Sequence, residues 1–503
     1  MRRLIPALLT PVLGAALALY GTGLASASTP AGTSTGLASA PPAGVAGFTP
    51  ADTPQLNATG SIEQIRQLVQ CGGTMYAVGT FTSVKKGTTV YAVNNAFSFS
   101  ATAPYAVTSW APDIVGSSTS SSGVVNSIAF NGTNCADAYI GGDFTSVNGT
   151  KVTDIAEVST STGDVVSAFG HTASASVQTL LGVDGHILAG GYYKTINGSS
   201  ADPYMTSLNP TTGKDDGFIN LGISGNYQFT CQAGSPGCPS NGEVSSNATR
   251  VYNQSLSHGG TLDLVMGDFT SVGGQPRQQI FMLNLATSPA TVTAWTSPQW
   301  DGSQGEQMQG GTTGYPYQCA GVEPFYIQAA AWSPDDSTIY IGTTGYHPNG
   351  WPIGETQRTG LCDAAAAFPA TQETVYSLWI NYIGCDSLYS AAADANAAYF
   401  GGHERFSMNP NDCDALGPDV GTDEGAYNAP GMEALNPAAS SAGGGLYVNS
   451  ADTAGYYSRG RGRGADDMLI TSKGLWIASD NQAGAADCDG FSAHAGICFL
   501  PYS

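Results

Sequence analysis

Residues 139–149 read Tyr-Ile-Gly-Gly-Asp-Phe-Thr-Ser-Val-Asn-Gly, and variants of this stretch recur along the chain. A short apolar run rich in β-forming residues meets Gly-Gly, where the missing side chains permit a bulge or a close backbone approach. The Asn-Gly pair that follows accepts the positive φ angles of a hairpin turn. One copy therefore predicts a buried strand that leads into a tight turn.

Seven copies of this stretch recur along the chain, and repetition of this kind indicates a closed array of similar units. Besides 139–149, they occupy residues 76–84, 187–198, 264–274, 339–343, 398–403 and 475–480. One aligned position reads Thr80, Asp143, Tyr192, Asp268, Thr343, His403 and Asp480. At Asp143 and Asp268 a carboxylate either accepts N–H bonds in the following turn or points toward a central channel.

The second unit shows the strand pattern most clearly. Its four predicted strands are residues 124–130, 138–144, 152–159 and 165–169, separated by turns that contain glycine. Four short antiparallel strands, repeated seven times, predict an all-β fold, namely a seven-bladed β-propeller with four-stranded antiparallel blades. We expect residues 54–60 to add the outermost strand of the last blade, beside 497–503, because this would remove exposed strand edges.

The Gly-Gly-Asp-Phe-Thr-Ser-Val-Asn-Gly pattern of residues 141–149 resembles the delta-sixty repeat, a β-propeller repeat of secreted and surface proteins of bacteria. The match is close in units two and four, intermediate in one and three, and weak after Ser333. This resemblance implies a propeller at or beyond the cell surface. It implies no reaction, because the family has no shared catalytic motif.

The N-terminal residues 1–27 have the pattern of a secretory signal peptide: a basic start, an apolar run at 4–20 and the small residues Ala25-Ser26-Ala27. The apolar run is too short to predict a membrane span. Residues 28–58 consist mainly of Ala, Ser, Thr, Gly and Pro and predict a flexible linker, which leaves 59–503 for the propeller domain. We therefore expect a protein that is extracellular or associated with the cell surface.

The chain of 503 residues is strongly acidic, with 16 Lys and Arg against 38 Asp and Glu and a formal net charge of −22. Removal of residues 1–27 takes away Arg2 and Arg3 and changes the net charge to −24. Such a charge argues against nucleic acid and anionic membranes as partners. We expect a monomer that does not span the membrane.

Ten cysteines, an even number in an exported chain, predict disulfides that staple the loops. Cys71 and Cys135 occupy equivalent turns of neighbouring units, so we expect them to pair. Pairs Cys231–Cys238 and Cys488–Cys498 would close short loops. Three pairings remain open for the other four, Cys319, Cys362, Cys385 and Cys413.

Long loops in units four to seven predict a ligand-binding face, since the loops between blades and those between second and third strands open on one side of a propeller. Aromatic side chains there suit stacking on sugar rings, and arginines suit anionic groups. The alternatives are local core packing for the aromatics and internal carboxylate partners for the arginines. The candidates are Trp300, Tyr315, Tyr317, Tyr346, Trp351, Arg405, Arg459, Arg461 and Arg463.

These features favour binding of a glycan or cell-envelope component on that face. An alternative is a glycan-active, glycoside hydrolase-like enzyme, because sugar hydrolysis uses two carboxyl groups that face one bond. A salt-bridged loop start is the other interpretation of residues 403–405. A third function is that of a structural surface protein without a small ligand. The catalytic candidates are His403, Glu404, Asp423, Glu424 and Glu355.

No cofactor or metal ligand motif is expected from the spacing of His, Cys and acidic residues. Acidic stretches at 411–414 and 419–424 leave a structural calcium ion open, although they lack the spacing of an EF-hand loop.

Overall fold

The computed structural model describes residues 51–57, 63–116, 123–226, 228–230, 243–245, 248–300, 326–345, 361, 363–383, 387–402, 404, 406–407, 427–428, 431–437, 445–446, 464–481 and 495–502. The chain divides into two units, 1–37 and 38–503, and every described residue belongs to the second. These residues form strands and turns and no helix. Accordingly, no helix in this part of the chain is long and apolar enough to cross a membrane.

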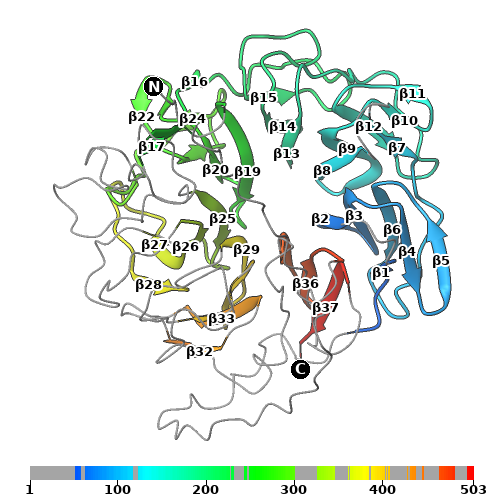
Figure 1. Ribbon diagram of the computed structural model, residues 1–503. Helices are drawn as coiled ribbons and strands as arrows, with labels where there is room; N and C mark the ends of the chain where they lie inside the picture. The colour runs from blue at the N-terminus through cyan, green and yellow to red at the C-terminus, as the bar shows by residue number, and fades with distance from the viewer. Residues whose placement is uncertain are drawn as a thin grey trace, which may run out of the picture. The chain divides into compact units, whose positions relative to one another are not determined.

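The main architecture is a series of antiparallel sheets that follow one another along the chain (Figure 1). Each first strand contacts the first strand of the next sheet, and the last of them contacts the first, so the series closes into a ring. The first strands are β2 (Gln64–Cys71), β8 (Val124–Asn131), β13 (Val177–Val183), β19 (Arg250–Leu256), β25 (Ile327–Trp332), β29 (Leu388–Ala393) and β35 (Asp467–Thr471). A closed ring of such sheets is a β-propeller.

The second strands of these sheets come from the repeated apolar runs. They are β3 (Thr74–Thr80), β9 (Asn134–Asp143), β14 (His186–Gly191), β20 (Leu262–Asp268), β26 (Thr338–Thr343), β30 (Ala398–Gly402) and β36 (Gly474–Ala478). The third strands are β6 (Ala96–Ser100), β12 (Ile155–Ser159), β15 (Met205–Leu208), β23 (Ile280–Asn284), β27 (Ala364–Pro369), β33 (Met432–Asn436) and β37 (Ile497–Pro501). A fourth strand is present in three sheets: β24 (Thr291–Val292), β28 (Trp379–Tyr382) and β34 (Gly445–Leu446).

The first three sheets have a single bridged pair where a fourth strand was expected, as Val158 with Val165 illustrates in the second. In that sheet the third strand begins at Ile155 rather than at residue 152. The chain then turns away, because Phe169 N donates to Val166 O at 3.2 Å. The predicted strand at 165–169 is therefore reduced to one bridge.

The Ser-Val part of the repeat forms a second, smaller sheet in three units. Each small sheet joins a hairpin to the segment that leads into the first strand of the same unit. Asn148 and Gly149, with φ angles of 47° and 76°, form the turn of the second hairpin. These sheets are β1 (Gln55–Leu56) with β4 (Ser83–Lys86) and β5 (Thr89–Ala92), β7 (Ile114–Val115) with β10 (Ser146–Val147) and β11 (Thr150–Lys151), and β16 (Ile223–Ser224) with β21 (Ser271–Val272) and β22 (Gln275–Pro276).

Two further small sheets each contain one pair of strands. They are β17 (Gln228–Thr230) with β18 (Glu243–Ser245), and β31 (Phe406–Ser407) with β32 (Tyr427–Asn428).

The described start of the chain lies beside its last strand. Ala51 N donates to Phe499 O at 2.9 Å, and Leu56 N donates to Ala495 O at 2.8 Å. The proximity expected for residues 54–60 is therefore present, but β1 pairs with β4 rather than forming the outermost strand of the last sheet. Residues 51–57 belong to the folded domain, although their composition assigned them to the linker.

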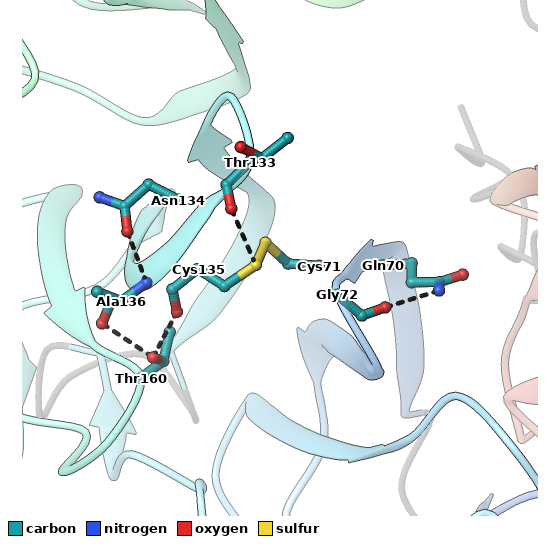
Figure 2. Close-up of a disulfide and its surroundings, with 8 residues drawn as sticks. All are labelled: Gln70, Cys71, Gly72, Thr133, Asn134, Cys135, Ala136 and Thr160. Atoms are coloured by element: carbon teal, nitrogen blue, oxygen red, sulfur yellow. Dashed lines mark hydrogen bonds between the residues drawn. A yellow bond between two sulfur atoms is a disulfide. The ribbon is translucent and has the colours of Figure 1, made fainter.

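A disulfide joins the first and second sheets. Figure 2 shows it between Cys71, at the end of β2, and Cys135, near the start of β9, with a Cα–Cα distance of 5.8 Å. This is the pair expected from the equivalent positions of the two turns. Cys498 is also disulfide-bonded. The remaining cysteines lie outside the described residues: Cys231, Cys238, Cys319, Cys362, Cys385, Cys413 and Cys488.

Candidate functional site

Most of the first strands carry a β-bulge at the same place. The pairing register shifts by one residue near the start of β2, β8, β13, β19, β25 and β29, which leaves one residue unpaired in each strand. Asp466 occupies the corresponding place before β35, because Asp467 pairs with Ala478 as Gln67 pairs with Val78. The resulting set of equivalent residues is Arg66, Asn126, Gln178, Tyr252, Gln328, Tyr389 and Asp466.

All seven of these residues line one cavity of about 190 Å³. Side chains from all seven first strands therefore meet there. The lining is dominated by amides, hydroxyls and charged groups, and the apolar residues of the sheets point elsewhere. A bulge re-aims a side chain relative to its strand, which explains how one position of the repeat supplies the whole ring.

The residues that follow the bulges connect neighbouring sheets. Gln67 Oε1 accepts from Ile128 N at 2.7 Å, and Ser127 Oγ accepts from Leu180 N at 3.0 Å. The ring closes when Asp467 Oδ2 accepts from Leu68 N at 2.9 Å. These hydrogen bonds hold the cavity wall in place.

The two arginines of the cavity are held differently. Arg66 Nη1 donates to Asn126 Oδ1 at 2.8 Å, on the next strand. The Arg250 guanidinium carbon lies 5.0 Å from the ring centroid of Tyr192 and 5.1 Å from that of Tyr252, so two aromatic rings flank the cation. Arg250 Nη1 also donates to Tyr192 Oη. Both arginines are thus fixed in the wall.

Burial raises the pKa of Asp467 to about 6, although hydrogen bonds from the Leu68 and Met468 amides lower it. Because the folded-state pKa lies above the unfolded value of 3.8, the folded protein retains a proton that the unfolded chain has lost between about pH 4 and pH 6. The contribution of Asp467 to stability is therefore present below pH 4 and is lost as the pH rises through 6.

We predict that Asp467→Asn removes this part of the pH dependence. The amide oxygen of asparagine still accepts from Leu68 N, whereas the titration disappears. Urea denaturation between pH 4 and pH 6 should show a decline in the free energy of unfolding that is shallower than in the wild type by up to about 1.4 kcal/mol per pH unit. The exposed Asp164→Asn controls for loss of one negative charge. Equal slopes in wild type and Asp467→Asn would contradict the prediction.

Two of the candidates from the loops are described, and both are buried. Trp300 is 1% exposed and packs with its ring centroid 4.6 Å from that of Phe368, so it is a core residue and not an exposed stacking platform. Glu404 is 0% exposed, which removes it from an open catalytic face. The prediction of an accessible site at these two residues is therefore wrong.

The other loop candidates lie outside the described residues, as do both acidic stretches proposed for calcium. They are Tyr315, Tyr317, Tyr346, Trp351, Arg405, Arg459, Arg461 and Arg463, together with His403, Asp423, Glu424 and Glu355. Within the part of the chain that the structure describes, no group of three His, Cys, Asp or Glu side chains is placed to hold a metal ion.

At the aligned position after Gly-Gly, Asp143 differs from its predicted roles, whereas Asp268 is buried and lies opposite Arg250 in the pairing of β19 with β20. Asp143 is exposed, and the amide of the following Phe144 donates to Asp154 Oδ1 at 3.1 Å instead. The register also places Thr344 rather than Thr343 at this position, because Gly342 pairs with Ala329 after the bulge in β25.

The cavity residues were missed because they lie within the first strands, whereas the predicted binding face lies in the long loops. One signal is visible in the sequence: a polar pair interrupts several first strands, as in Arg66-Gln67, Asn126-Ser127 and Gln178-Thr179. In each pair the first residue faces the cavity and the second bonds to the adjacent sheet or strand.

The ring of antiparallel sheets around a polar cavity defines this protein as a β-propeller. No known protein family matches the chain, and no curated protein matches it in sequence. Its structure is similar to the WD40 repeats of RRP9, with 8% identity, a TM-score of 0.41 and coverage of 90% of this chain and 100% of that chain. It is also similar to BamB from Moraxella catarrhalis, with 12% identity, a TM-score of 0.35 and coverage of 89% and 99%.

Proposed function

We propose that this chain is a secreted, seven-bladed propeller that binds a glycan or a glycan-like component of the cell envelope in its central polar cavity. The observation that carries the proposal is the convergence of side chains from all seven first strands on one cavity. The seven-bladed count is supported by the contact of β35 with β2, which closes the ring without a gap in the series. Export is supported by the signal-like residues 1–27.

The chemistry of the cavity suits a hydroxyl-rich ligand. Primary amides offer both donors and acceptors, as sugar hydroxyls do, so each amide can match either role of a hydroxyl. Gln328 is half-buried in the wall, and among the described residues its side-chain amide makes no hydrogen bond. Tyr252 and Tyr389 add aromatic surface to the same cavity, which suits the apolar face of a sugar ring.

A titration of the purified full chain with a panel of soluble plant, fungal and bacterial oligosaccharides tests this function. Gln178→Ala and Gln328→Ala should each weaken binding roughly tenfold, because each removes one hydrogen-bonding group from the wall. Gln70→Ala changes an exposed glutamine at the far end of β2 and should leave binding unchanged.

Three results would overturn the proposal. Absence of binding to any oligosaccharide would remove the glycan as ligand. Binding that both cavity variants leave intact would place the site elsewhere. Release of reducing ends in the same samples would replace a binding protein with a glycan-active enzyme.

A further inference from the structure

Two of the three arginines in the described part of this acidic chain line the cavity. The chain has a formal net charge of −22, and the described residues include three arginines. Two of them, Arg66 and Arg250, line this cavity, whereas Arg277 bonds to Pro276 O and Thr293 O in a turn. A protein that is poor in cations thus places two of them where a ligand would lie.

Arg250 has N–H donors that form no hydrogen bond within the described protein. A guanidinium has five N–H donors, and the hydrogen bond that Arg250 makes goes to the Tyr192 hydroxyl. Its Nε is buried and meets no hydrogen-bond acceptor among the described residues. The Nη groups retain further donors, and an anionic group of a ligand in the cavity would accept hydrogen bonds from them.

The flanking rings hold the guanidinium in place before any ligand arrives. Tyr192 and Tyr252 lie at nearly equal distances from its central carbon, 5.0 and 5.1 Å. Because the planar guanidinium is already held in place, it loses little conformational entropy when it binds a planar carboxylate through two hydrogen bonds.

The two carboxylates that line the cavity lie away from Arg250, whereas the buried Asp268 lies opposite Arg250 in the pairing of β19 with β20. Asp466 precedes β35 and Asp467 begins it, whereas Arg250 begins β19. In the ring of first strands, β25 and β29 separate β19 from β35 on one side, and β2, β8 and β13 separate them on the other. Among the lining residues, Arg250 is therefore the cation more distant from Asp466 and Asp467, since Arg66 lies on β2, next to β35.

We propose that the cavity selects an acidic sugar, a uronate, whose carboxylate pairs with Arg250 while its hydroxyls meet the amides of the wall. This inference rests on the proposed function and names the ligand class for the same site. A uronate carboxylate would accept charge-assisted hydrogen bonds from the Nη groups of Arg250, whereas a neutral hydroxyl at the same place would form weaker ones, and this difference is the source of the selectivity.

The test compares two ligands that share one ring, methyl glucuronide and methyl glucoside, by calorimetric titration of the full chain. The wild type should bind the glucuronide roughly tenfold to a hundredfold more tightly, the range expected for charge-assisted hydrogen bonds. Arg250→Gln should remove this preference and leave glucoside binding within about twofold. Tyr192→Phe, which keeps the ring and removes the hydroxyl, should preserve the preference. Lys151→Gln, on an exposed strand, controls for the loss of one positive charge.

The outcomes separate this inference from the proposed function. Equal binding of the two sugars by the wild type would refute the role of Arg250 and uphold a glycan site. A preference that persists in Arg250→Gln would refute it as well. If Arg250→Gln bound neither sugar and its thermal unfolding were unchanged, Arg250 would bind the sugar ring rather than the carboxylate. No binding of either sugar, with binding of other glycans in the panel, would also refute it, and no binding of any glycan would refute both proposals.

Discussion

Gly142→Ala should destabilise the domain by at least about 3 kcal/mol and sharply reduce the yield of folded protein. A Cβ atom at Gly142 would lie 2.0 Å from Val124 O and 2.9 Å from Val125 Cα. Both are backbone atoms of β8 at its bulge, so relief requires the pairing of β8 with β9 to break. Urea denaturation followed by intrinsic fluorescence measures the loss.

Gly149→Ala is the matched control in the same copy of the repeat. No atom lies within 4 Å of a Cβ built there, and only the φ of 76° opposes alanine. The expected cost is about 1 kcal/mol, the penalty for a side chain in the left-handed region. If Gly142→Ala unfolded at the same urea concentration as Gly149→Ala, close backbone approach would not be the reason for the second glycine of the repeat.

Trp476→Ala should cost about 3–5 kcal/mol, the range for truncation of a large buried aromatic side chain. Trp476 is 1% exposed and stacks on Phe499 with ring centroids 4.1 Å apart. Its centroid also lies 5.7 Å from that of Phe99 in the first sheet. Truncation therefore leaves a cavity where the last sheet meets the first.

Because this cavity would lie between the last and the first sheet, hydrogen exchange provides a second test. Hydrogen exchange should accelerate most in β2 and β35, the first strands on either side of the junction. Trp379→Ala, an equally buried tryptophan in β28, should cost a similar free energy without this local effect. A loss below about 1 kcal/mol in Trp476→Ala, or equal exchange in both variants, would show that Trp476 does not close the ring.

Most of the fold can be predicted from the residues of the repeated stretch. Apolar runs such as 139–141 become second strands, since their alternate side chains bury on the two faces of a sheet. The Asn148-Gly149 turn forms because these residues accept positive φ. The expected pairing of Cys71 with Cys135 follows from the same repetition, because equivalent turns of adjacent units lie next to each other.

The extent of each sheet depended on contacts that the repeat does not encode. Residues 165–169 have the alternation of a strand, yet a turn at Phe169 leaves a single bridge. Residues 51–57 have the composition of a linker, yet Leu56 is buried against the end of the chain, more than 400 residues away. Tertiary packing overrode local composition in both places.

The sequence by itself determined the strands, their turns and the repetition that makes a ring, because these follow from backbone preferences and the burial of short apolar runs. Only the tertiary structure decided the site. Arg66, at the bulge of β2, and Arg250, two residues before the bulge of β19, are far apart in the chain, and ring closure brings both to one cavity. Tertiary packing also buries Trp300, which lies against Phe368 of β27, and Glu404.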